Sequence, residues 1–131
     1  MTADEYFPAA LMRHMGFDSL VEDSTDGRAV VRYEARPEFT HSAGTTVQGG
    51  IVTTWLDHAM ARAVFARDPG AAVASLEIKV SFIGRVPPGP SLAEARVVRW
   101  GRQIVFLEAT LKSPSGDLLA TASSCGKLLT R

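Results

Sequence analysis

The chain has 131 residues, a length that predicts one domain over residues 1–131 with a core large enough to need no disulfides. Its 14 basic and 14 acidic residues give a formal net charge of zero, which favours neither nucleic acid nor a membrane surface as a partner. The single cysteine, Cys125, excludes an intrachain disulfide and suits a reducing compartment. Because the sequence shows no basic leader and no run of about 18 apolar residues, we expect a cytoplasmic protein without a membrane span.

The first third of the chain predicts a short helix followed by a hairpin. Apolar residues at spacings of three and four indicate a helix over residues 6–15, with Pro8 tolerated in its first turns and Gly16 ending it. Residues 20–21 and 29–33 are interpreted as two strands joined by the turn Thr25-Asp26-Gly27. Residues 39–47 are mostly small and polar, which predicts a loop.

A long helix is expected over residues 51–67, because two adjacent rows of apolar side chains repeat there every four residues. The rows are Ile51, Trp55, Ala59 and Ala63, and beside them Val52, Leu56, Met60 and Val64. This face is too broad for a helix that lies on a surface, so other elements should wrap it. The sequence Asp68-Pro69-Gly70 is expected to end the helix.

The second half of the chain predicts strands only. Apolar and polar residues alternate over 74–82, and a break at 87–90 precedes strands over 92–100, 104–112 and 118–124. One curved antiparallel sheet of about five or six strands around one long central helix is an α+β architecture, the hotdog fold. Its open edges favour a two-fold dimer that joins two sheets edge to edge.

Chemistry is expected where the long helix begins. Gln48-Gly49-Gly50 places two glycines at a helix N-terminus, whose free amides and positive dipole suit a polarised carbonyl oxygen. Tight packing of the helix on the sheet is the alternative explanation for the glycine pair. Asp57 lies about two turns further on and projects to nearly the same side as Gly50.

A carboxylate within an apolar helix is costly unless it is paired or functional, which makes Asp57 a candidate catalytic group. The alternative is a solvated polar stripe that Asp57 shares with Thr53, Thr54 and Arg62. His41 and His58 have no metal-ligand spacing with Asp57, so we expect no metal site.

A signature run stands at residues 41–50, HSAGTTVQGG, and Leu56-Asp57-His58-Ala59 follows it. Together these motifs resemble the hotdog-fold acyl-CoA thioesterases of the phenylacetate-degradation type, in which an acid follows eight residues after the first glycine of the pair. The resemblance continues through residues 75–78, 87–89 and 101–102 into the last strands. The chain departs from the family pattern at Gln48, where histidine is usual, and at Ser42, where asparagine is usual.

This resemblance implies hydrolysis of a medium-sized or aromatic acyl-CoA thioester to the free acid and CoA, with no cofactor. The Gly49 amide would face the thioester carbonyl, and Asp57 would act as general base or nucleophile across the interface of a homodimer or homotetramer. Ser75 would orient the attacking water. Gln48 would share the work of the usual histidine through its side-chain amide. Substrate-binding roles would fall to Ser42 and Gly50.

A thioester suits this sparse set of groups, because its thiol leaving group has a pKa of about 8.5 and needs no strong acid to help it depart. The sequence contains no G-x-S-x-G elbow for a serine nucleophile. Two other functions stay open. A noncatalytic hotdog module that binds acyl-CoA is favoured by the departures at Gln48 and Ser42. A hydroxyacyl-thioester dehydratase would want an Asp/His pair, and His58 is adjacent to Asp57 but is expected to point away from it.

Overall fold

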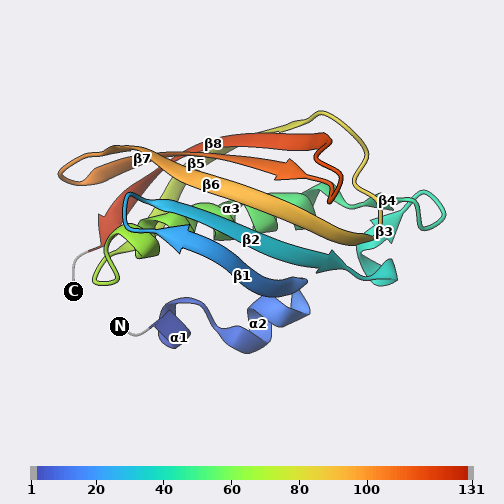
Figure 1. Ribbon diagram of the computed structural model, residues 1–131, viewed down its shortest axis with the longest axis horizontal. Coiled ribbons are helices and arrows are strands. Elements are labelled where there is room, and N and C mark those ends of the chain that lie inside the picture. Colours follow the sequence, from blue (N-terminus) through green and yellow to red (C-terminus); the bar gives the residue numbers. More distant parts are fainter. Residues whose placement is uncertain (1–2, 130–131) are drawn as a thin grey trace.

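The computed structural model describes residues 3–129, which form one large sheet, a separate two-stranded hairpin, one long helix and a helical N-terminal segment (Figure 1). The helices are α1 (Ala3–Tyr6), α2 (Ala9–His14) and α3 (Gly49–Arg67). The strands are β1 (Phe17–Ser24), β2 (Arg28–Ala35), β3 (Thr40–His41), β4 (Thr46–Val47), β5 (Ala72–Phe82), β6 (Gly89–Trp100), β7 (Ile104–Lys112) and β8 (Leu118–Leu129).

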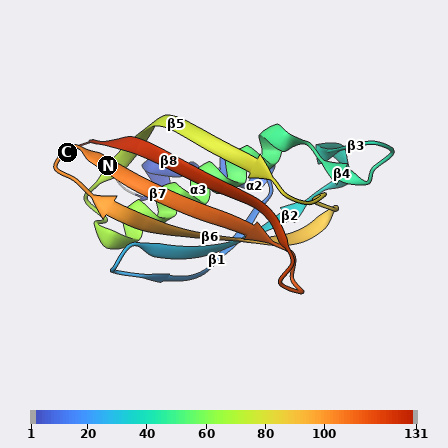
Figure 2. The same cartoon turned by 90° about the horizontal axis from the view of Figure 1, so that it is seen from above.

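Six of the strands form a single antiparallel sheet in the order β1-β2-β6-β7-β8-β5. Helix α3 crosses one face of this sheet, and α1 and α2 lie beside β1 and α3 (Figures 1 and 2). The expected α+β hotdog architecture, with one long helix against a curved antiparallel sheet, is therefore confirmed. In the described part of the chain, no helix is long and apolar enough to cross a membrane.

The core lies between α3 and the sheet. Both predicted rows of apolar side chains on α3 are buried, except that Ile51 at the start of the first row is only half-buried. The sheet meets them with many small side chains, which let the helix axis approach the strands closely. These buried alanines are Ala29, Ala35, Ala93, Ala95, Ala109, Ala120 and Ala122.

The N-terminal segment differs from the prediction of one helix over residues 6–15. It forms two short helices, which are interrupted at Phe7 and Pro8. Pro8 disfavours helical geometry in the residue before it, and it has an extended ψ of 113° itself. The break turns Phe7 into the core, where only 6% of its surface is exposed.

The segment predicted as a loop over residues 39–47 contains regular structure. A 3-10 turn at Pro37–Phe39 leads into the two-residue strands β3 and β4, which pair with each other. Helix α3 then begins at Gly49, two residues earlier than predicted.

The connection between strands that was expected over residues 87–90 was also placed too late in the sequence, because Gly89 and Pro90 already belong to β6. Pro90 pairs with Glu34 near the end of the β2–β6 ladder, a position where a missing amide proton is tolerated.

Strand β5 forms one open edge of the sheet. A β-bulge between Ser75 and Glu77 shifts its register against β8 and leaves Leu76 without a partner residue. The apolar side chains of Leu76, Phe82 and Ile83 are 59%, 56% and 59% exposed along and just beyond this edge. An edge strand with large exposed apolar side chains is a surface that another chain can cover.

Two buried serines in the sheet offer a matched test of the core. The hydroxyl of Ser91 has no hydrogen-bond partner among the described residues, whereas that of Ser124 donates to the Glu77 carbonyl at 2.8 Å. We expect Ser91→Ala to leave the free energy of unfolding unchanged or to raise it by up to about 1 kcal/mol, and Ser124→Ala to lower it by about 1 kcal/mol. Urea unfolding of both variants measures this. Equal losses in the two variants would show that Ser91 has a partner.

Candidate functional site

Helix α3 is capped by the side chain of Gln48. Its Oε1 atom accepts hydrogen bonds from the amides of Gly50 at 2.7 Å and Ile51 at 3.3 Å. The backbone amide of Gln48 donates to the Phe39 carbonyl at 2.8 Å, which ties the start of the helix to the preceding turn. The Gly49 amide, in contrast, takes part in no hydrogen bond within residues 3–129. One free donor thus remains at the positive end of the helix dipole.

Both glycines are also explained by what surrounds them. A Cβ atom on Gly49 would lie 3.1 Å from the ring of Phe82, and one on Gly50 would lie 2.8 Å from the capping oxygen of Gln48. The packing of helix on sheet that the sequence left open as an explanation therefore has a physical basis at Gly49, which lies against Phe82 of β5, whereas Gly50 is close to the capping side chain of its own helix. Phe82 was absent from the sequence-based site. Its only sequence signal was an apolar residue in an alternating strand, which does not distinguish it from a core residue.

Asp57 and Ser75 lie together although they are 18 positions apart. The Ser75 hydroxyl donates to Oδ1 of Asp57 at 2.7 Å. Asp57 is half-buried on the side of α3 that faces β5, and Ser75 is exposed next to the β-bulge of that strand. The hydroxyl thus holds one carboxylate oxygen in place, and no hydrogen bond in the described part of the chain uses Oδ2.

Gly49 and Asp57 do not meet within one chain. They are eight residues apart on a continuous helix, which corresponds to about 12 Å along the helix axis at about 1.5 Å per residue. One thioester group spans far less than this separation. The two groups can therefore act on the same carbonyl only if one of them comes from another chain.

The structure places Ser42 in the exposed turn between β3 and β4, with a positive φ of 54°. Its hydroxyl lies 2.9 Å from Nδ1 of His41, and its carbonyl accepts a hydrogen bond from Thr45 at 2.8 Å. Among the described residues it makes no hydrogen bond to Gln48, Gly49 or Asp57. Ser42 is thus not brought together with the other predicted site residues in a single chain.

The other side chains of the solvated polar stripe, the alternative considered for Asp57, make their contacts away from the Asp57 carboxylate. Thr53 and Thr54 donate to the carbonyls of Gly49 and Gly50, one turn earlier, at 2.8 and 2.9 Å. The guanidinium of Arg62 lies over the ring of Phe7, 4.1 Å from its centroid. These side chains are engaged elsewhere, which leaves the hydroxyl of Ser75 as the hydrogen-bond partner of Asp57 in the described residues.

His58 is buried and points away from Asp57. Arg62 donates to its Nε2 atom at 3.3 Å, so Nδ1 carries the imidazole proton and donates to the Tyr33 hydroxyl at 2.7 Å. Tyr33 in turn donates to the Trp55 carbonyl at 2.9 Å. Burial, reinforced by the nearby charge of Arg62, lowers the pKa of His58 to about 3. His58 is therefore a neutral core residue. Separately, no group of three or more potential metal ligands occurs in residues 3–129.

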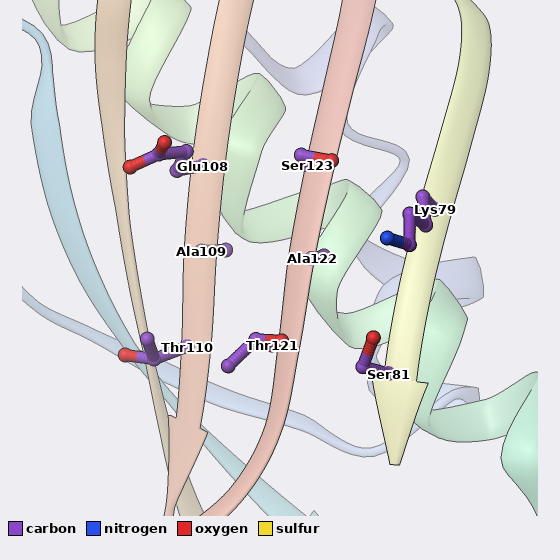
Figure 3. Close-up of a pocket in the computed structure, with 8 residues that line it drawn as sticks. All are labelled: Lys79, Ser81, Glu108, Ala109, Thr110, Thr121, Ala122 and Ser123. Carbon is purple, nitrogen blue, oxygen red and sulfur yellow. The ribbon is translucent and has the colours of Figure 1, made fainter. Parts of the chain in front are cut away.

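A concave region lies on the face of the sheet away from α3. It is a groove of about 280 Å³ across β5, β7 and β8, lined by Lys79, Ser81, Glu108, Thr110, Thr121 and Ser123 among others (Figure 3). Figure 3 shows α3 behind the sheet, on the side away from these side chains. None of the predicted site residues lines the groove, so it is separate from the pair formed by Asp57 and Ser75.

The buried neutral state of His58 predicts how stability depends on pH. In the unfolded chain its pKa returns to 6.5, so between about pH 6.5 and about pH 3 the unfolded chain binds a proton that the folded chain does not. The free energy of unfolding should therefore fall as the pH falls through this range. We expect His58→Gln to be less stable than the wild type at about pH 7 but to lose less stability on acidification to about pH 4. Parallel curves from urea unfolding would contradict the assignment.

Comparisons with known proteins agree with the fold. The family model of the thioesterase superfamily matches residues 44–120, which is more than half of the chain. A provisionally assigned esterase of Saccharolobus solfataricus is 29% identical over 119 residues, which cover 91% of this chain and 84% of the relative.

Two solved structures extend the comparison. A provisionally assigned thioesterase from Ralstonia eutropha JMP134, described as phenylacetic acid degradation-related, is 28% identical with a TM-score of 0.80, over 90% of this chain and 89% of that one. A hypothetical thioesterase from Streptococcus pneumoniae TIGR4, solved with coenzyme A, is 13% identical with a TM-score of 0.85, over 98% and 97% of the two chains, and shares the fold. From the family match and the hotdog architecture together, the chain belongs to the thioesterase superfamily.

Proposed function

We propose that the protein is an acyl-CoA thioesterase in which Asp57 is the catalytic carboxylate. The observation that carries this proposal is the hydrogen bond of 2.7 Å by which Ser75 holds Asp57 at the open edge of the sheet. A carboxylate fixed through one oxygen leaves the other oxygen available to water or substrate. Membership of the thioesterase superfamily supports the reaction class.

The reaction needs few groups. As a general base, Asp57 takes a proton from water while the water oxygen bonds to the thioester carbon, and the carbonyl oxygen becomes an oxyanion. The Gly49 amide donates to this oxyanion, aided by the positive end of the α3 dipole. The carbon–sulfur bond then breaks and the CoA thiolate leaves with the electron pair, to be protonated by solvent or by Asp57. As a nucleophile, Asp57 would attack the carbon itself and expel the CoA thiolate, and water would then hydrolyse the resulting mixed anhydride to the free acid and the regenerated carboxylate.

The active unit in this proposal is at least a homodimer. The separation of about 12 Å along α3 requires that the Gly49 amide and the Asp57 carboxylate at one thioester belong to different subunits. Strand β5 is the natural contact, because it carries Ser75, has an open edge and exposes Leu76 and Phe82. Pairing of two copies of β5 would bury this edge and bring two sites to one interface.

The substrate proposed is a medium-sized or aromatic acyl-CoA, and the site is proposed to work without a cofactor. Coenzyme A is bound by the pneumococcal protein of the same fold, and the Ralstonia protein is connected by its description with phenylacetic acid degradation. On the chain itself, the ring of Phe82 is 56% exposed and lies beside Gly49, so it supplies an apolar surface that would suit an acyl group whose carbonyl meets the Gly49 amide.

One observation favours a noncatalytic acyl-CoA-binding module as the second candidate. Gln48 uses its Oε1 atom to cap α3, and so it occupies the Gly50 and Ile51 amides that an oxyanion would otherwise meet. The Nε2 atom of Gln48 can still donate to a carbonyl. A dehydratase is disfavoured, because His58 is hydrogen-bonded to Tyr33 and Arg62 instead of Asp57.

The first test replaces the carboxylate. Asp57→Asn keeps the shape of the side chain and still accepts the hydrogen bond from Ser75, but it removes the charge. We expect kcat to fall by about 10²–10⁴ while the melting temperature changes little. Release of free CoA from acetyl-, hexanoyl-, benzoyl- and phenylacetyl-CoA, followed with a thiol reagent, measures turnover. Turnover within a fewfold of the wild type would exclude Asp57, whereas a wild type that binds these compounds without releasing CoA would favour the noncatalytic module.

The second test asks whether two subunits share a site. Gly49→Val should block access to the amide and lower kcat by about 10²–10³, with Phe82 shifting to make room. We then mix this variant with Asp57→Asn after partial unfolding and refolding. If each site uses Gly49 from one chain and Asp57 from the other, random dimers regain about a quarter of the wild-type activity. If the mixture is no more active than its components although mass spectrometry finds mixed dimers, Gly49 of one chain and Asp57 of the other do not serve the same thioester, and the shared site is contradicted.

A further inference from the structure

The side chain of Tyr6 reaches the open edge of the sheet. Its hydroxyl donates to the Val73 carbonyl at 2.6 Å and accepts from the Val73 amide at 3.0 Å. One side chain thus satisfies both backbone polar groups of a residue in the edge strand, 67 positions later in the sequence. Val73 is two residues before Ser75, so the contact fixes β5 next to the residue that holds Asp57.

The neighbouring Phe7 is anchored to the helix that carries Asp57. Its ring meets the ring of His58 edge-on at 5.2 Å and lies under the guanidinium of Arg62 at 4.1 Å. Tyr6 and Phe7 also contact each other, with ring centroids 4.5 Å apart. Two consecutive residues therefore connect β5, through Val73, with α3, through the residue adjacent to Asp57.

This connection matters because β5 is an edge strand whose pairing is interrupted next to Ser75. The strand has a neighbour on one side only, and the bulge between Ser75 and Glu77 interrupts its ladder with β8. A bulge changes the direction in which nearby side chains point. The orientation of the Ser75 hydroxyl thus depends on how the strand is held just before the bulge, and Tyr6 holds it there.

We propose that Tyr6 is a positioning residue, which sets the hydrogen bond between Ser75 and Asp57 by fixing Val73. This inference rests on the proposed function of Asp57. The electrostatics agree with it: burial raises the pKa of Tyr6, the hydrogen bond with Val73 opposes the rise, and the nearby charge of Asp57 adds to it. The phenol therefore keeps the proton that it donates to the Val73 carbonyl.

The variant Tyr6→Phe removes only the hydroxyl and tests the proposal. We expect kcat on the fastest acyl-CoA of the panel to fall by about ten- to a hundredfold through misplacement of the carboxylate, with KM changed by less than about twofold. If Tyr6 acts through Ser75, the double variant Tyr6→Phe/Ser75→Ala should be no slower than Ser75→Ala alone. Losses that multiply in the double variant would overturn the proposal.

A control separates positioning from general loosening of the N-terminal segment. Met12 is buried in α2 and is not among the partners of Val73, so Met12→Ala should lower the melting temperature and leave kcat unchanged. If Met12→Ala lowers kcat as much as Tyr6→Phe does, the hydroxyl has no special role. A fully active Tyr6→Phe beside an inactive Asp57→Asn would refute the role of Tyr6 alone, whereas a fully active Asp57→Asn would refute the proposed function.

A second measurement does not depend on activity. Amide hydrogen exchange should become at least about tenfold faster in residues 73–78 of Tyr6→Phe than in the wild type, and it should stay unchanged in β7. Unchanged protection in residues 73–78 would show that Tyr6 does not hold the strand, and this would overturn the proposal even if turnover were lost.

Discussion

The whole arrangement depends on burial of α3 against one face of the sheet. The helix is apolar around much of its circumference. It would leave apolar side chains in water if it lay on the surface, and a single neighbouring helix would bury only part of them. A sheet face rich in alanine allows a close approach, and the curved six-stranded sheet covers both apolar rows. Because the position of α3 is set by this packing, the places where its polar groups emerge are set as well.

Adjacent residues on α3 meet opposite surroundings for this reason. A rotation of about 100° per residue turns His58 into an aromatic pocket with Tyr33 and Phe7, while Asp57 faces the edge strand β5. His58 is consequently neutral and buried in the core, whereas the carboxylate of Asp57 accepts a hydrogen bond from Ser75 at the open edge of the sheet. Because adjacent side chains on a helix point in different directions, Asp57 and His58 do not form an Asp/His pair although they are neighbours in the sequence.

Local patterns in the sequence predicted the parts of the fold that depend on periodicity. The rows of apolar residues predicted α3, and the alternation of apolar and polar residues over 74–82 predicted most of β5, whereas only residues 20–21 of β1 were expected to form a strand. The break at Pro8 and the short hairpin of β3 and β4 were missed, because proline near a helix start is usually tolerated and two-residue strands have no period. Among the candidate site residues, Asp57 was chosen for its place in an apolar helix and Ser75 by the family resemblance, and the structure brings the two together. The contacts of Tyr6 with Val73 and of Phe82 with Gly49 link distant segments and leave no local pattern.

The open edge of β5 connects the stability of the chain with its proposed chemistry. A free edge strand in a monomer can pair with another chain. The β5 edge has a bulge and exposed apolar side chains, and the Tyr6 hydroxyl occupies its backbone polar groups at Val73. Tyr6 occupies both backbone polar groups of Val73, so a partner strand could add to β5 only beyond that residue. The contact that holds Ser75 toward Asp57 would therefore also limit the register in which a second copy can pair. Since Gly49 and Asp57 lie about 12 Å apart along α3, that register would decide which amide faces which carboxylate.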